Sequence, residues 1–267
     1  MPSWARTRRT TGGWATRGGG FTALNQVDGE QAFYSQSISQ AQPGPFPDAF
    51  SSTFNVNGTG SFVLPENLGL DTGASESVSL WFKTTATGQV LAGASADQIG
   101  AGTTSTTTSG FVPVLYVGAD GRLQGQFYTG SAANTISTST AVNDGHRHNA
   151  VLTAGADPAG GGGSQQEDLY LDGQLVAHTL AGQGATGVQA NNTYFGAGFL
   201  GGSWPDIPAA DQTAGKGTTA FYTGSMSDVA YYLSQLSAAQ VAQEWNAAQG
   251  AAGPGPSETA TVPSGSL

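Results

Sequence analysis

The chain of 267 residues contains no cysteine, few charged residues and no long hydrophobic run. Without cysteine, the sequence excludes disulfides, thiolate metal sites and cysteine nucleophiles. No segment approaches the roughly 18 consecutive apolar residues that a membrane-spanning helix needs, so membrane insertion is not expected. Charged residues form 10% of the chain, well below the roughly 25% of an ordinary soluble domain. Uncharged polar residues and glycine must therefore supply most of the surface.

Positive charge is the scarcest property of this sequence. Eight Lys and Arg residues stand against 18 Asp and Glu residues, which gives a net charge of −10. A generally basic nucleic-acid binder is excluded by this balance. Half of the bases fall within the first 17 residues, so residues 18–267 carry four bases against all 18 acids and a net charge of −14. The body of the protein is therefore strongly acidic.

The chain divides into a basic arm over residues 1–24, a body over residues 25–250 and a Gly/Pro/Ser-rich tail over residues 251–267, which is typical of a flexible segment. No apolar stretch follows the arginines of the arm, so neither a classical signal peptide nor a twin-arginine signal is expected. Arg and Trp dominate binding hot spots, and we expect the arm to bind a protein partner through Trp4, Arg6, Arg8, Arg9, Trp14 and Arg17. Docking of the arm onto its own acidic body is an alternative that charge also favours.

Short alternation of apolar and polar residues dominates the body and predicts strands rather than helices. In residues 77–83, Val78, Leu80 and Phe82 share one face, which is the pattern of a half-buried strand. Further strands are predicted at residues 52–56, 60–64, 89–93, 146–153, 193–199 and 221–232. Residues 103–110 and 160–166 are rich in Gly, Ser, Thr and Gln, and we expect long surface loops there.

Two Asp-Gly pairs predict hairpins. Asp120-Gly121 and Asp172-Gly173 each lie between short apolar stretches, and Asp-Gly supplies the positive φ angles that a type I′ turn needs. Many short strands separated by turn residues indicate a sandwich of two sheets.

One helix is predicted, over residues 237–249. Ser237 can cap its first turn, and Gln240 three residues later completes a capping box. Trp245 lies on the apolar face and is expected to pack against the sandwich, and Gly250 is placed to end the helix in a left-handed conformation.

Four segments of the body carry a family resemblance. Residues 78–84 read Val-Ser-Leu-Trp-Phe-Lys-Thr, residues 144–153 read Asp-Gly-His-Arg-His-Asn-Ala-Val-Leu-Thr, and residues 169–176 read Leu-Tyr-Leu-Asp-Gly-Gln-Leu-Val. A closing pattern runs through Phe221, Gly224, Met226, Asp228, Val229, Tyr232, Leu236, Ser237 and Val241. In this order the segments resemble the laminin-G-like, concanavalin-A-like jelly rolls. The resemblance implies an all-β, two-sheet antiparallel jelly-roll sandwich with one C-terminal helix. The main departure is Arg147, where the family usually has Trp.

A candidate ligand-binding loop spans residues 199–213 and presents Phe199, Trp204, Asp206 and Asp211 among Gly and Pro. An exposed Trp beside a carboxylate suits sugar or peptide binding, because the ring stacks on apolar faces and the carboxylate accepts hydrogen bonds. In the alternative interpretation Trp204 packs against the edge of its own sheet. That alternative is slightly favoured, because large aromatic side chains are mostly buried.

No metal or cofactor is expected. His146 and His148 alternate along a strand and so share a face, which is the geometry of a two-ligand metal site. No nearby acid clearly completes such a site. The family resemblance implies a structural, hydrogen-bonding role for His148.

Catalysis is not expected either. A glycosidase needs two carboxylates roughly 5–10 Å apart on either side of the sugar bond. Glu167, Asp168 and Asp172 include the turn residue of a predicted hairpin, and the Glu-x-Asp-x-Glu strings of jelly-roll glycosidases do not occur. The three histidines give no Ser-His-Asp set beyond chance pairing.

The sequence favours a non-catalytic jelly-roll module that is displayed on a large assembly, such as a virion or an injection apparatus, and attached through its arm. That reading implies protein partners, an oligomeric or assembly-bound state, and a location on a virion or extracellular surface. A free extracellular lectin-like module that binds glycan or protein is the alternative. A glycoside hydrolase is a third reading, and nucleic acid is not an expected partner.

Overall fold

The computed structural model describes residues 22–24, 31–34, 38–45, 50–54, 60–63, 75–99, 107–108, 110–127, 135–156, 165–181, 192–209, 212, 216–232 and 234–249. The arm residues Trp4, Arg6, Arg8, Arg9, Trp14 and Arg17, the tail, and most of the predicted loops at 103–110 and 160–166 lie outside these ranges. The predicted division into arm, body and tail therefore stays a prediction. Within the described ranges, no helix is long and apolar enough to cross a bilayer.

The described chain is a sandwich of two large antiparallel sheets with one helix, as the sequence predicts. The eight-stranded sheet has, in spatial order, β1 (Thr22–Leu24), β2 (Gln31–Tyr34), β5 (Phe62–Val63), β15 (Asn192–Phe195), β7 (Gln89–Ser95), β9 (Phe111–Val117), β10 (Arg122–Gly125) and β11 (Ile136–Ala141). The seven-stranded sheet has β14 (Gln174–Ala181), β13 (Gln165–Leu171), β12 (Arg147–Ala156), β6 (Glu76–Lys83), β18 (Gly224–Tyr232), β4 (Phe50–Phe54) and β3 (Ile38–Pro43). A third, smaller sheet contains β16 (Ala197–Gly201), β17 (Gly217–Phe221) and β8 (Thr107–Thr108).

The main core lies between the two large sheets and follows the period of two residues. Val78, Leu80 and Phe82 of β6 point into it together with Leu152 of β12 and Leu115 of β9, and each is at most 1% exposed. Because successive strand residues point to opposite faces, alternate residues of β6 and β12 line this core, whereas β9 places the adjacent Val114 and Leu115 in it at an irregularity of its pairing with β7.

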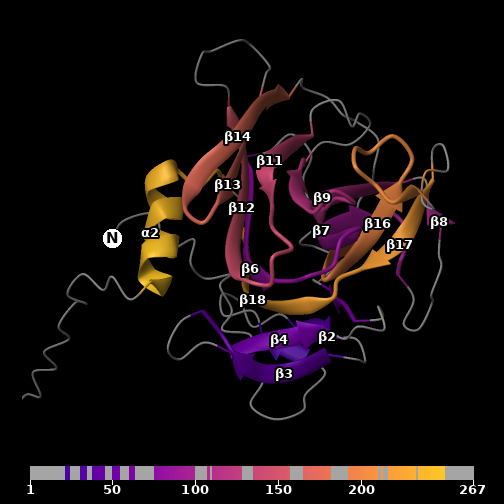
Figure 1. Cartoon of the computed structure of the whole chain (residues 1–267), viewed down its shortest axis with the longest axis horizontal. Coiled ribbons are helices and arrows are strands. Elements are labelled where there is room, and N and C mark those ends of the chain that lie inside the picture. The colour runs from indigo at the N-terminus through magenta and orange to yellow at the C-terminus, as the bar shows by residue number, and fades with distance from the viewer. Residues whose placement is uncertain are drawn as a thin grey trace, which may run out of the picture.

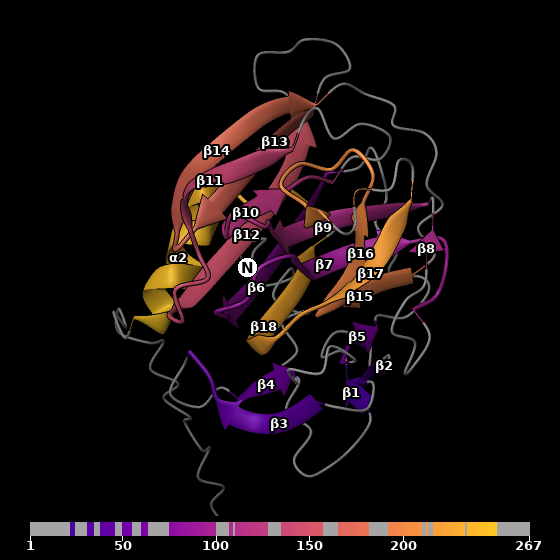
Figure 2. The same cartoon turned by 45° about the vertical axis from the view of Figure 1, so that its right-hand side comes forward.

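Further elements cover the outer faces of both sheets. Helix α2 (Ala238–Ala248) lies along the outer face of the seven-stranded sheet, and β16 and β17 lie on the opposite side of the molecule, over β7 and β9 (Figure 1 and Figure 2). Val90 and Tyr116, from the outer face of the eight-stranded sheet, pack against Leu200 of β16. The central strands β6, β7 and β9 of the two large sheets are therefore buried on both faces, apart from the end of β6 at Lys83.

Both predicted hairpins form. At the β13–β14 turn, Asp172 and Gly173 both have positive φ (53° and 77°), as a type I′ turn requires. At the β9–β10 connection, positive φ occurs at Gly121 (81°) but not at Asp120, so the predicted type I′ turn is wrong there. Gly121 N instead donates to Gly118 O (3.1 Å), which makes a four-residue connection with a single left-handed glycine.

The predicted helix is confirmed with its capping box. Ser237 Oγ accepts from Gln240 N, and the Gln240 side chain accepts from Ser237 N. Trp245 stacks on Trp81 of β6, with ring centroids 5.3 Å apart and an interplanar angle of 11°. The predicted end at Gly250 lies outside the described residues, and Gln249 caps the helix with φ −77°.

Two predictions need correction. The predicted half-buried strand at 77–83 is buried on both faces up to Phe82, because α2 covers the face that carries Trp81. The single strand predicted at 193–199 breaks at Gly196 (φ 76°), and its halves β15 and β16 join different sheets. Arg147, the departure from the resemblance, is half-buried and donates from Nη2 to Pro43 O (2.9 Å).

Candidate functional site

Five connections between strands meet at one end of the sandwich, and we call them the loop rim: residues 84–88, 118–121, 142–146, 172–173 and 202–209. Backbone hydrogen bonds join neighbouring loops of this set. Gly145 N donates to Thr84 O (3.0 Å). Val142 N donates to Gly121 O (2.8 Å). The loop rim is therefore one hydrogen-bonded surface rather than a group of independent loops.

Phe199 does not belong to this surface. It lies in β16, not in a loop, and is 1% exposed. Its ring packs against Phe111 of β9, with centroids 6.2 Å apart. The expectation that the loop presents Phe199 is therefore wrong, because the strand extends to Gly201 and turns this ring toward the eight-stranded sheet.

Trp204 is half-buried and lies on the outer face of the eight-stranded sheet. Its ring is 6.5 Å from that of Phe111, tilted by 45°, and 6.5 Å from that of Tyr116, nearly perpendicular at 87°. The residue packs against the main core and against both clusters between the eight-stranded and three-stranded sheets. Trp204 thus anchors the 202–209 loop to the sheet beneath it.

Asp206 is the exposed polar group of this loop. Its backbone has φ 51°, which few residues other than glycine adopt. Its carboxylate Oδ2 accepts from Gln124 Nε2 (3.0 Å), and its carbonyl oxygen accepts from Ala119 N. The loop is therefore fixed to the β9–β10 hairpin while the carboxylate stays at the surface. Asp211, the fourth predicted residue, lies outside the described residues.

Tyr116 secures the same loop from below. Its hydroxyl donates to Pro205 O (2.8 Å). Burial raises the pKa of Tyr116, and the negative charges of Asp206 and Asp120 raise it further. The hydroxyl therefore keeps its proton and remains a donor to the loop.

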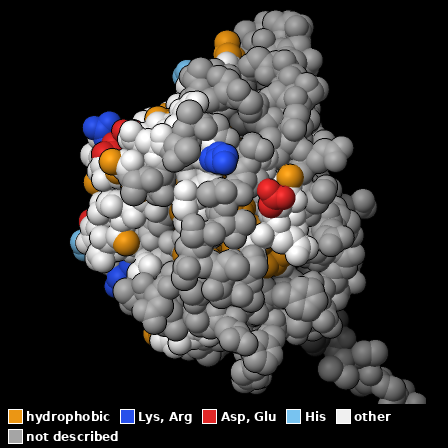
Figure 3. Space-filling view, turned by 90° about the vertical axis from the view of Figure 1, so that its right-hand side faces the viewer, with side chains coloured by type: hydrophobic (Ala, Val, Ile, Leu, Met, Phe, Trp, Pro, Cys, Tyr) orange, Lys and Arg blue, Asp and Glu red, His pale blue; other side chains and the backbone are white. Residues whose placement is uncertain are grey.

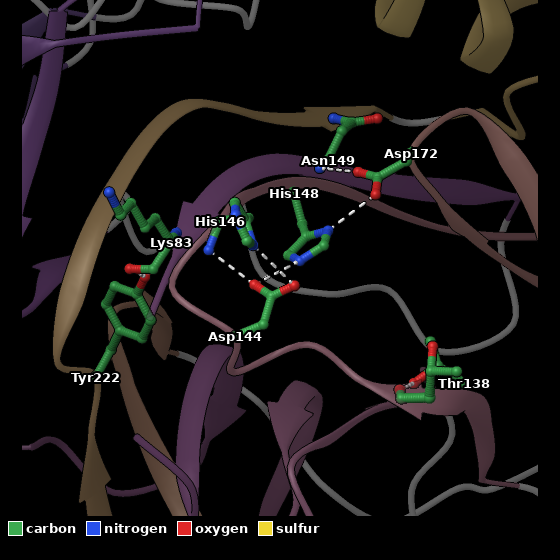
Figure 4. A network of polar contacts seen from close by, with 9 residues as sticks. Lys83, Thr138, Asp144, His146, His148, Asn149, Asp172 and Tyr222 are labelled. Atoms are coloured by element: carbon green, nitrogen blue, oxygen red, sulfur yellow. Dashed lines mark hydrogen bonds and ion pairs between the residues drawn. The ribbon is translucent and has the colours of Figure 1, made fainter. Parts of the chain in front are cut away.

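A second polar group of the loop rim centres on His148 (Figure 4). His148 lies between two carboxylates, with Nδ1 2.8 Å from Asp172 Oδ2 and Nε2 3.2 Å from Asp144 Oδ1. Asp172 Oδ1 also accepts from Asn149 N (2.9 Å). The His148 ring thus ties the β13–β14 turn to the 142–146 loop, which agrees with the structural role that the family resemblance implies.

The hydrogen bonds of this network stabilise the ionised form of Asp144 and the protonated ring of His148. The backbone N–H of His146, which donates to Asp144 Oδ1 (2.7 Å), is the largest cause that lowers the pKa of Asp144 to about 2. The hydrogen bond to Asp172 is the largest cause that raises the pKa of His148. His146 is itself largely exposed, with Nδ1 3.2 Å from Asp144 Oδ2. Within the described ranges, no three His, Asp or Glu side chains are arranged to hold a metal ion.

Two acids face the core at the other end of the sandwich. No motif of the sequence predicted that they lie near each other. Glu76 of β6 and Glu167 of β13 both pair in register with Ala154 of β12, so they lie in one row across the sheet. Glu76 is 1% and Glu167 0% exposed. The alternation of strand residues could have revealed this placement, since Glu76 shares a face with Val78 and Glu167 shares a face with Leu169.

Described charged side chains are sparse on the face that the three-stranded sheet covers (Figure 3). Figure 3 shows the face over the three-stranded sheet, where the described Lys, Arg, Asp and Glu side chains stand as a few separate groups. Among these side chains, no extended patch of one sign lies on that face.

No protein-family model matches the sequence, and no curated protein matches it either. Among solved structures, a mutant of Trypanosoma rangeli sialidase displaying trans-sialidase activity is similar with a TM-score of 0.51 and 16% identity, over 87% of this chain and 32% of that one. Domain 4 of an extracellular arabinanase from Geobacillus stearothermophilus, in complex with arabinotriose, gives 0.46 and 15%, over 80% of this chain and 87% of that one.

A botulinum neurotoxin serotype D/C binding domain gives a TM-score of 0.47 and 10% identity, over 85% of this chain and 49% of that one. The chain thus spans about a third of the sialidase and half of the toxin domain. At these identities the likeness concerns the β-sandwich fold alone.

Proposed function

We propose that the chain is a non-catalytic recognition module, a jelly roll of the laminin-G-like kind that binds glycan or protein at the loop rim. The observation that carries this proposal is the fixation of the 202–209 loop. Gln124 donates to the Asp206 carboxylate and Ala119 N donates to the Asp206 carbonyl oxygen, while the residue stays exposed. Loops that are ordered before binding lose less entropy on binding. An ionised carboxylate in such a loop accepts hydrogen bonds from hydroxyl or amide groups.

Within this proposal, Asp206, Asp211 and the exposed part of Trp204 contact the ligand, whereas Phe199 supports the loop from the core. The Trp204 ring already contacts Phe111 and Tyr116. The carboxylates therefore contribute more to recognition than stacking does, which favours a ligand rich in hydroxyl or amide donors.

A hydrolase is not what the described geometry favours. Asp144 and Asp172 of the loop rim are both engaged with His148, and the buried carboxyl pair Glu76 and Glu167 is closed to solvent. A substrate must reach both groups for general acid catalysis. We therefore propose no catalytic activity for the chain.

The binding test uses a glycan microarray probed with labelled full-length protein, Asp206→Asn and the matched control Asp97→Asn. Asp97 is an exposed carboxylate that follows β7 at the opposite end of the sandwich. A lost charge-assisted hydrogen bond costs about 1.5–3 kcal/mol, so we expect Asp206→Asn to weaken retention at least about tenfold and Asp97→Asn to leave it unchanged. An array without any retained glycan, or equal weakening by both variants, contradicts glycan recognition at this loop.

Attachment to a larger assembly, such as a virion or an injection apparatus, is the second part of the proposal and rests on the sequence of the arm. Four arginines and two tryptophans can pair with carboxylates and fill apolar pockets of a protein partner. Deletion of residues 1–20 should leave a soluble, folded sandwich that no longer co-sediments with its assembly. Normal incorporation of the truncated chain favours the alternative, a free extracellular glycan- or protein-binding module.

A further inference from the structure

The buried pair Glu76 and Glu167 has no role in recognition at the loop rim, and its placement is unusual. Both side chains project from the core-facing side of the seven-stranded sheet, on either side of Ala154. Two carboxyl groups without solvent contact are costly unless each finds donors or a countercharge. The surroundings of the pair therefore decide its charge.

Glu167 has too few donors for an ionised carboxylate. Tyr231 Oη donates to Glu76 Oε2 (2.6 Å), and Phe127 N donates to Glu167 Oε1 (3.1 Å). Glu167 Oε2 is buried and has no hydrogen-bond partner. An ionised carboxylate can accept about four hydrogen bonds, whereas a protonated one turns an oxygen into a donor. The unpartnered oxygen is therefore the natural position for a proton.

The charges that face Glu167 point to the same conclusion. Its strand neighbours contribute Ala154 from β12 and Thr179 from β14, which do not titrate. Strand β11 carries no titratable residue, and the segment after β10 faces the group with Gln126 and Phe127.

Among the described residues, the ionisable groups at this site are Glu76 of β6 and Tyr231 of β18, which donates to Glu76, and neither supplies a positive charge. Burial is the largest cause that raises the pKa of Glu167 to about 8, and the charge of Glu76 raises it further. No cation from the described residues acts on Glu167 to offset these effects.

We propose that Glu76 and Glu167 form a proton-binding site inside the sandwich, in which Glu167 keeps a proton at neutral pH and the fold weakens as pH rises from about 5 to about 8, because the folded chain must hold a proton that the unfolded chain has lost. The site would make this end of the sandwich sensitive to pH, while the loop rim keeps ionised carboxylates. A divalent cation bridging the two carboxylates is the competing occupant, and the test separates it from the proton.

The direction of the effect follows from linkage. The folded state holds the proton up to about pH 8, whereas the unfolded chain loses it near its ordinary value of 4.5. Between these values the folded state binds one proton more, so stability falls as pH rises. One proton changes the unfolding equilibrium constant about tenfold for each pH unit.

The experiment is urea unfolding of the full-length protein from about pH 5 to about pH 8 in 1 mM EDTA, with Glu167→Gln and the control Asp97→Asn. We expect the unfolding constant of the wild type and of Asp97→Asn to rise about tenfold per pH unit more steeply than that of Glu167→Gln. Equal slopes in all three proteins overturn the proposal.

A second measurement does not depend on whether Glu167→Gln folds. Infrared or carboxyl ¹³C spectra of the wild type at pH 7 should contain one protonated carboxyl signal that disappears on unfolding. Absence of that signal overturns the proposal. If 1 mM calcium replaces EDTA and removes the pH dependence of the wild type, the pair binds a cation, and the proton site is likewise overturned.

Discussion

The two ends of the sandwich hold carboxyl groups in opposite environments. At the loop rim, Asp144 lies at the surface beside His146 and His148, and these donors hold its pKa at about 2. At the far end Glu167 is buried, faces Glu76, and has a pKa of about 8. Solvent and several donors stabilise the first charge, whereas burial and the neighbouring Glu76 destabilise the second, which has one backbone donor. The comparison separates a surface suited to recognition from an interior suited to holding a proton.

The largest expected effect comes from removing the acid that anchors the loop rim. Asp172→Ala deletes the acceptor for His148 and for Asn149 N and places alanine at φ 53°. We expect a loss of about 3 kcal/mol in urea unfolding at pH 6. Asp172→Asn tolerates the left-handed backbone and keeps one acceptor, so it should lose about 1 kcal/mol. Equal losses would show that the His148 contact, not the backbone, determines the cost.

The second largest effect is expected at the end of the sandwich that holds Glu76 and Glu167. Tyr231→Phe removes the donor to buried Glu76 and should cost about 1.5–3 kcal/mol in unfolding at pH 7. Tyr232→Phe is the matched control, because Tyr232 donates to the half-buried Glu244, which also accepts from Ser79. A Tyr232→Phe loss as large as that of Tyr231→Phe would contradict the special demand of the buried pair for donors.

The local signals of the sequence predicted most of the fold, and contacts distant in sequence explain the remainder. The hairpin at Asp172-Gly173 and the helix capped by Ser237 depend on a few adjacent residues, and both are confirmed. Burial of the Trp81 face of β6 depends on a helix more than 150 residues later, which strand periodicity does not encode.

The candidate site was predicted less completely than the fold. Trp204 and Asp206 were named from their loop, but Phe199 lies in a strand because β16 extends to Gly201. The row formed by Glu76, Ala154 and Glu167 depends on the register of three strands, which the local pattern of residues does not encode.

A smaller effect concerns His148. Because its pKa is raised in the folded state, the protonated ring stabilises the fold fully below about pH 6.5, and this contribution is lost as pH rises through the raised value. An NMR titration of the ring should show the raised pKa in the wild type and a lower one in Asp172→Asn. A wild-type pKa at or below the ordinary value would contradict the ion-pair network at the loop rim.

The smallest effect is expected from Asp144→Asn. The lowered pKa means that the Asp144 carboxylate stabilises the fold above about pH 4 and that this contribution is lost as pH falls through about 2. Solvent screens this exposed group, so its removal should cost less than about 0.5 kcal/mol at pH 6. A larger loss in urea unfolding would mean that this carboxylate is shielded from water much as the buried pair is.

The most direct test of the central claim compares ligand retention by Asp206→Asn and Glu167→Gln on the same glycan array at pH 6. Both variants remove one carboxyl group, one from the loop rim and one from the core. Our account predicts that Asp206→Asn loses retention at least about tenfold, while Glu167→Gln keeps the wild-type pattern. Retention that survives Asp206→Asn and disappears in a folded Glu167→Gln would place recognition at the buried pair and contradict the account.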